Sequence, residues 1–299
     1  MMLLDLFSAF EYTFVRNMFV AGLLASIACG IIGTYVVVRR LVFISGGIAH
    51  TCFGGVGLAY LLGFDPMLGA LVFALGTAVA VGLAGLRTRI REDSTIGVLW
   101  VLGMALGLIF IRFAPGYVPD LGSILFGDIL LVKSQDLWLM LFLVVGIVAI
   151  VAIFYRQLLA LTFDEEFARI MGVPTEMIYV LLLALIALTV VLLLKVVGVI
   201  LVIALLTIPA TISGLFNTRM KSMMFMAVLV GCVVTTIGSL LSWQYNLPVG
   251  ATIVVVASLA LLIALLANKL GIRLSAKTEP GPSRGGADSA RGPSPRAEP

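Results

Sequence analysis

Long apolar runs, each about twenty residues and almost free of charge, follow one another along most of this 299-residue chain. A helix needs about 20 predominantly apolar residues to cross the ~30 Å hydrocarbon layer of a bilayer. The composition agrees, because 62% of the residues are hydrophobic and only 11% are charged, whereas roughly a quarter of a soluble globular chain is charged. The sequence therefore predicts an all-α fold, a polytopic transmembrane helical bundle forming one domain over residues 1–272.

Eight or nine membrane spans are expected, each delimited by its apolar length and by Gly, Pro or charge at its ends. Basic residues gather in alternate connections, which face the cytoplasm under the positive-inside rule and put the N-terminus outside. A model with the N-terminus inside needs eight spans and one segment that is re-entrant or interfacial. The expected spans are residues 14–38, 42–62, 66–86, 95–113, 136–155, 176–195, 197–215, 222–242 and 248–268.

Two segments fall outside this pattern. Residues 115–134 mix Pro, Gly and Asp with short apolar runs, which predicts a re-entrant or surface helix on the outer side. Residues 273–299 are rich in Pro, Gly, Ser and Ala, so we expect a disordered cytoplasmic tail. The net charge of +4 is scattered through short connections and forms no basic face, so no nucleic-acid partner is expected.

The single histidine, His50, lies in a glycine-rich span over residues 43–63. At about 100° per residue, four glycines share its helical face, which predicts close packing on another helix. An ionisable side chain inside a membrane marks a functional site by default, and neutral imidazole is a common ligand of divalent metals. His50 is therefore the candidate metal ligand, with a hydrogen-bonded structural role as the alternative. The packing glycines are Gly46, Gly47, Gly54 and Gly57.

A short helix outside the membrane is expected within the connection over residues 156–177. Thr162 and Glu165 form a capping-box pattern at its start, and Gly172 stops it. A helix of two to three turns is marginal in water, so its apolar residues must pack on the chain's own helix ends or on a partner subunit. The residues assigned to partner docking are Asp164, Glu165, Glu166, Phe167, Arg169, Met171 and Gly172.

Residues 193–216 form an apolar run that is too long for one span, and Lys195 and Gly198 are predicted to break it. Pro209 then interrupts a helix that also carries Thr207. Broken membrane helices often line pathways, because the backbone groups freed by proline need hydroxyls or water. Thr207 and Pro209 are therefore pathway candidates, and a simple kink without a transport role is the alternative.

Several catalytic motifs are absent from the sequence. It has no phosphate-binding G-x-x-x-x-G-K-[ST] loop, no zinc-protease or nucleophile-elbow motif and no cluster of intramembrane carboxylates. Any ATP hydrolysis must therefore come from another chain, and no catalytic residue is expected. The lack of charged intramembrane groups disfavours the alternative function, a secondary transporter driven by an ion gradient. The missing catalytic groups disfavour an intramembrane enzyme.

Four segments in order resemble the metal-ion permease family of ABC importers. RRLVFISGGIAHTCFGGVGLAYLLG is similar to its second-span signature, LGSILFGDILL to its outer-loop motif, LTFDEEFARIMGVPTEM to its coupling region and VVGVILVIALLTIPAT to its late proline-containing span. The resemblance covers residues 12–270. It implies the multi-pass permease subunit, in the cell (inner) membrane, of an ATP-driven importer of zinc, manganese or iron, or of their chelates.

The resemblance also implies partners. These are a second permease subunit in a homodimer or pseudo-dimer, two cytoplasmic ATP-binding subunits, an extracytoplasmic solute-binding protein and the membrane lipid. The divalent metal ion is then the transported substrate, and no cofactor is bound permanently.

The chain departs from that family at one position. The family commonly carries an acidic residue four positions before the histidine, and this chain has Gly46 there. A lone imidazole must then borrow ligands. The candidates are Ser45, Thr51 or the partner subunit's His50, and Ser45 and Thr51 are added to the pathway residues.

Overall fold

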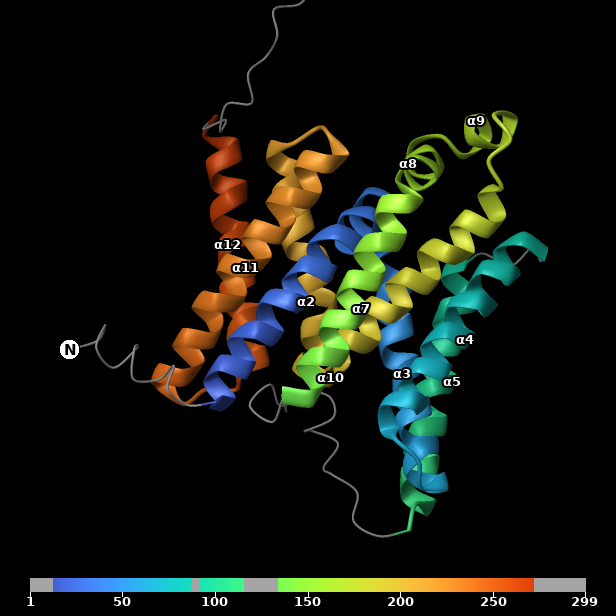
Figure 1. Cartoon of the computed structure of the whole chain (residues 1–299), viewed down its shortest axis with the longest axis vertical. Coiled ribbons are helices and arrows are strands. Elements are labelled where there is room, and N and C mark those ends of the chain that lie inside the picture. The colour runs from blue at the N-terminus through green and yellow to red at the C-terminus, as the bar shows by residue number, and fades with distance from the viewer. Residues whose placement is uncertain (1–12, 88–91, 116–133, 272–299) are drawn as a thin grey trace, which may run out of the picture.

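The computed structural model describes residues 13–87, 92–115 and 134–271, whose helices are drawn in Figure 1. Within these ranges, eight helices are long and apolar enough to cross a membrane. Each expected span lies on a helix to within a few residues, which confirms the predicted helical bundle. The helices are α2 Thr13–Val38, α3 Val42–Leu62, α4 Pro66–Arg87, α5 Glu92–Phe113, α7 Ser134–Ile153, α8 Tyr155–Phe163, α9 Glu165–Ile170, α10 Thr175–Phe216, α11 Met220–Tyr245 and α12 Val249–Lys269.

Helix α10 consists of two halves joined at Gly198, whose φ of 71° and ψ of 173° are not helical. A straight helix of 42 residues would be about 63 Å long, twice the thickness of a hydrocarbon core. Near the start of α10, the Tyr179 ring lies under the guanidinium of Arg39, a residue just after the end of α2. Near the end of α10, the Ser213 hydroxyl donates to the Met223 carbonyl at the start of α11. Both ends of α10 therefore lie on one side, and the second half, Leu201–Phe216, returns across the bundle as the predicted break requires.

The two sides of the bundle differ in charge. The first described helix begins and the last one ends at opposite ends of the molecule (Figure 1). This requires an odd number of crossings, which the eight long helices and the returning half of α10 provide. Arg39 contacts α8 and α9, and Lys221 lies over the Tyr155 ring of α8, so basic residues gather at the end that carries these two short helices. The positive-inside rule makes this the cytoplasmic end. This arrangement favours the topology with the N-terminus outside.

Helix α3 lies at the centre of one half of the bundle, where it packs against α4, α5 and α10. A Cβ at Gly55 would clash with the backbone oxygen of Gly69 on α4, so this approach requires glycine. The predicted outer helix over residues 115–134 lies outside the described residues except at its two ends, and the tail over residues 273–299 lies outside them altogether.

Candidate functional site

The His50 ring is stacked on Trp100 of α5, with ring centroids 4.4 Å apart and planes inclined by 11°. Trp100 also meets Phe43, which precedes His50 by about two turns of α3, at a centroid distance of 5.6 Å. The Nδ1 atom of His50 is buried and has no hydrogen-bond partner in the described part of the chain. A histidine held by hydrogen bonds would engage such an atom. The imidazole therefore keeps a nitrogen that is free of hydrogen bonds to the described residues.

Gly46 precedes His50 by one helical turn and is buried against side chains of α10 and α5. A Cβ at position 46 would lie 3.3 Å from the Cδ1 atom of Ile203 and 3.9 Å from the Cζ3 atom of Trp100. Both neighbours are side chains, and the nearer is the flexible end of an isoleucine. The His50 side of α3 thus faces the second half of α10.

A stripe of half-exposed side chains runs along that half of α10 through Ile203, Thr207 and Thr211. These residues are four positions apart and share one helical face. The Thr207 hydroxyl donates to the Ile203 carbonyl and the Thr211 hydroxyl to the Thr207 carbonyl, each at 2.7 Å. Pro209 is buried, so it shapes the helix from behind this face. The threonine stripe therefore leads from the neighbourhood of His50 toward the cytoplasmic end of α10.

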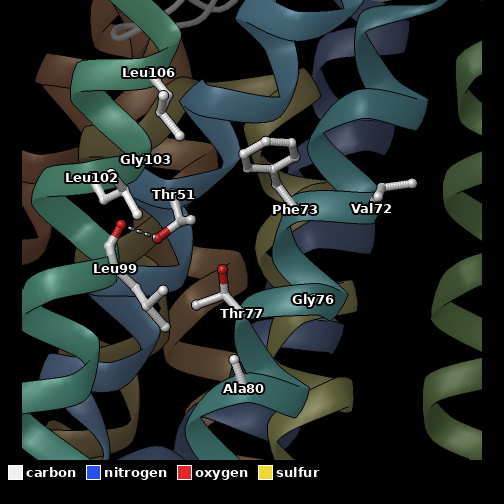
Figure 2. Close-up of a pocket in the computed structure, with 10 residues that line it drawn as sticks. All are labelled: Thr51, Val72, Phe73, Gly76, Thr77, Ala80, Leu99, Leu102, Gly103 and Leu106. Carbon is white, nitrogen blue, oxygen red and sulfur yellow. Dashed lines mark hydrogen bonds between the residues drawn. The ribbon is translucent and has the colours of Figure 1, made fainter.

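Ser45 and Thr51 occupy other faces of α3. At about 100° per residue they lie about 140° and 100° around the helix from His50. Both are buried, and their hydroxyls donate to the carbonyls of Val42 and Gly47 at 2.8 and 2.7 Å. Thr51 lines an apolar cavity of about 290 Å³ between α3, α4 and α5 (Figure 2). The structure thus does not bring either hydroxyl to the face of α3 that carries His50.

No metal cluster accompanies the histidine. Among the described residues, no three His, Cys, Asp or Glu side chains lie close enough together to hold a metal ion. Within the described ranges, His50 is therefore not part of a three-residue metal-ligand cluster.

Two of the predicted packing glycines, Gly54 and Gly57, lie against the backbone of α5. A Cβ at Gly57 would be 2.5 Å from the Gly107 oxygen, and one at Gly54 would be 2.8 Å from the Gly103 oxygen. Small residues of this kind let membrane helices approach closely. The other two glycines, Gly46 and Gly47, meet the side chains of Ile203 and Ile96 instead.

The short helix α9 is capped differently from the sequence prediction. Asp164 has extended backbone angles, and its carboxylate accepts a hydrogen bond from the Phe167 amide at 2.8 Å. Thr162 belongs to the separate helix α8, where its hydroxyl donates to the carbonyl four residues earlier. The predicted capping box of Thr162 and Glu165 is therefore wrong, because Asp164 separates the two helices and takes the N-cap position itself. The αL conformation of Gly172, with φ of 79°, follows the helix as expected.

The apolar side chains around α9 are exposed. Of the α9 residues only Ala168 is buried. The alternative that the apolar side chains pack on the chain's own helix ends therefore does not hold for the described part of the molecule. The apolar α9 surface consists of Phe163, Phe167, Ile170 and Met171, all more than half exposed.

Arg39 joins α9 to the rest of the bundle. Its Nη2 donates to Glu165 Oε2 at 2.9 Å and its Nη1 to the Leu161 carbonyl of α8. Its guanidinium carbon lies 5.3 Å from the centroid of the Tyr179 ring on α10. The Tyr179 hydroxyl donates in turn to Glu92 Oε2 at 2.6 Å, in the first turn of α5. A chain of polar contacts thus reaches from α9 to the helix whose tryptophan stacks on the histidine.

Sequence reasoning missed four of these residues, Trp100, Arg39, Tyr179 and Glu92. Trp100 carried a signal that could have been used, because it is one of only three tryptophans and lies within an expected span. Arg39 and Glu92 were visible only as charges near span ends.

A chain that crosses the membrane repeatedly and carries exposed apolar side chains at its cytoplasmic end fits the class of multi-pass membrane transport proteins. Comparison with known proteins agrees with this class. The model of the ABC 3 transport family matches residues 11–268, and the chain belongs to this family.

Relatives cover nearly the same length. The chain is 36% identical over 248 residues to the manganese transport system membrane protein MntC of Halalkalibacterium halodurans, covering 83% of this chain and 85% of the relative. It is 33% identical over 270 residues to MntC of Listeria monocytogenes, covering 90% and 96%. Among solved structures it is similar to PsaBC from Streptococcus pneumoniae in complex with Fab, with a TM-score of 0.80 and 30% identity, over 89% of this chain and 95% of that one.

Proposed function

We propose that this chain is the membrane-spanning permease subunit of an ATP-driven importer of divalent metal ions, free or chelated. Membership of the ABC 3 transport family and the similarity to manganese transport membrane proteins support this function. Two permease subunits form a homodimer around one pathway. ATP-binding subunits dock on α9, and an extracytoplasmic solute-binding protein delivers the metal at the other end.

The free Nδ1 atom of His50 is the observation that carries the proposed pathway. The metal passes His50 and then the threonine stripe on the returning half of α10. A pathway must bind its substrate strongly enough to admit it and weakly enough to release it. One imidazole without a carboxylate one turn away binds a metal weakly enough to release it. It also suits a metal that arrives with its own ligands.

The polar contacts of Arg39 provide the route by which the ATPase drives the pathway. Movement of α9 changes the position of Glu165 and hence of Arg39, whose guanidinium lies over Tyr179. The Tyr179 hydroxyl holds Glu92 at the start of α5. Because α5 carries the ring stacked on His50, a shift of α9 can open or close the space beside the histidine. ATP hydrolysis itself takes place in the separate subunit.

Two substitutions of His50 test the pathway. His50→Ala removes both the ring and its nitrogens, whereas His50→Phe keeps an aromatic ring for Trp100 but has no nitrogen. We expect both variants to lose most metal uptake in proteoliposomes that contain the ATPase, with dimer assembly and ATPase binding unchanged. Normal uptake by His50→Phe would show that only ring stacking matters, and the proposed metal contact would then be wrong.

The same vesicles separate this function from a secondary transporter. Uptake should require the ATPase subunit and ATP and should persist when ionophores dissipate the ion gradients. Uptake that proceeds without ATP and collapses with the gradients would contradict the proposed importer.

A further inference from the structure

A groove with no role in the proposed pathway lies on the surface of the bundle between α7 and α11. Both helices pack against α2 but hardly touch each other, and Figure 1 shows α2 flanked by α11 on one side and α7 on the other. The groove has a volume of about 490 Å³, within the range of roughly 300–1,000 Å³ typical of small-ligand sites. Its lining is almost entirely aliphatic or aromatic, with Ile31, Val148, Ala152, Phe225 and Val228 among its residues.

A lysine stands at the cytoplasmic end of this groove. Lys221 belongs to its lining, is exposed, and has its Nζ atom 5.1 Å from the centroid of the Tyr155 ring. Arg156 and Arg219, close to these two residues in sequence, are exposed as well. None of the three cations forms an ion pair with a carboxylate of the described residues. Lys221 therefore places a positive charge at this end of the groove, with no carboxylate partner among the described residues.

The start of α11 adds to this positive potential. Arg219 occupies the N-cap position, no side-chain hydrogen bond caps the helix, and the first turn holds no acidic residue. The N-terminal end of a helix carries a partial positive charge, so cations there are unfavourable unless an anion lies nearby. Lys221, the second residue of α11, lies at this end.

We propose that the groove binds an anionic phospholipid of the cytoplasmic leaflet, with an acyl chain in the groove and its phosphate beside Lys221. The apolar walls suit a hydrocarbon chain and give a free phosphate ion nothing to contact. Basic pockets between transmembrane helices on the cytoplasmic side are the usual sites for acidic headgroups. A zwitterionic lipid fits the same walls but brings its own cation close to Lys221, so the site prefers a net negative headgroup.

Native mass spectrometry of the purified transporter tests this site with phosphatidylglycerol and phosphatidylcholine of identical acyl chains. The unmodified protein should retain phosphatidylglycerol in preference to phosphatidylcholine. Lys221→Gln should lower phosphatidylglycerol retention about fivefold, the effect of one cation at the membrane surface, and Lys221→Arg should restore it. The matched control is Lys269→Gln, which removes a cation from the last turn of α12 and should change nothing.

A second variant tests the groove itself. Ala152→Trp fills the space from an exposed position on α7 and should reduce retention of both lipids. Equal retention of the two lipids by the unmodified protein, or an equal effect of Lys221→Gln and Lys269→Gln, would overturn the proposal. The proposal would also be overturned if the Ala152→Trp protein kept its lipids but no longer formed a dimer, because another protein chain and not a lipid would then cover the groove.

Discussion

Replacing Arg39 with glutamine removes the positive charge that holds α9 against α2 and α10, and we expect the ATPase cycle to become uncoupled from transport. The arginine side chain is only 16% exposed and its partner Glu165 is 42% exposed. Glutamine is too short and too weak a donor to span both Glu165 and the Leu161 carbonyl. The apolar α9 surface proposed for docking is untouched, so the ATPase should still bind.

The size of the effect follows from the three contacts that are lost. The ion pair with the partly exposed Glu165 contributes about 1 kcal/mol, and the position over the Tyr179 ring about 0.5–1 kcal/mol. The charge-assisted bond to the Leu161 carbonyl contributes about 1.5 kcal/mol, part of which glutamine retains. A net loss of about 2 kcal/mol weakens the connection about 30-fold, which lies within the usual range of coupling free energies between sites.

The assay is the ratio of metal transported to ATP hydrolysed in proteoliposomes. Arg39→Gln should lower this ratio about tenfold or more, and Arg39→Lys should give an intermediate value because it keeps the charge but not the planar fork. The matched control is Arg40→Gln, since Arg40 is the adjacent residue and is exposed. An unchanged ratio in Arg39→Gln, or an equal loss in Arg40→Gln, would refute the proposed route.

Two further predictions concern docking and packing. The double substitution of Phe167 and Met171 by glutamate should abolish co-purification of the ATPase, because both side chains belong to the exposed apolar α9 surface. Membrane insertion should be retained. Continued co-purification would exclude this surface as the docking site. Gly57→Leu should lower the thermal unfolding midpoint, since its Cβ would press on the Gly107 oxygen at a cost of about 1–3 kcal/mol or more. At the control position Gly146 an added Cβ would have no atom within 4 Å, so Gly146→Leu should unfold normally. Equal midpoints for the two variants would argue against the tight contact.

The membrane helices could be predicted from the sequence because the bilayer sets their length and composition independently of tertiary packing. The break in α10 was also visible, since a long apolar run containing Gly198 must turn back to stay in the membrane. The N-cap residue of α9 could not be predicted, because Thr162 and Asp164 both satisfy the local pattern for an N-cap. Which of them takes the role depends on where α8 ends, and that end is set by packing on the neighbouring helices.

The site was only partly predictable. His50 stood out as a costly intramembrane group, and the glycines beside it indicated a close helix contact. The stacking on Trp100 depends on the register between α3 and α5, which one sequence does not contain. The pairing of Arg39 with Glu165, residues 126 positions apart, likewise requires the folded arrangement. Ser45 and Thr51 were chosen as neighbours along the chain, whereas the helix turns their side chains to other faces.

The close contact of α3 with α5 has a consequence for motion. Backbone contact at Gly54 and Gly57 and ring stacking at His50 leave no room for the two helices to slide past each other. We therefore expect them to move as one rigid body, so that the boundary that changes in the proposed transport cycle lies between this pair and the returning half of α10. At that boundary the space beside Gly46 is closed by the tip of Ile203, a side chain that can change rotamer. The histidine would then be exposed or covered by a rotation of one isoleucine and a small tilt of a helix pair, without any helix unfolding.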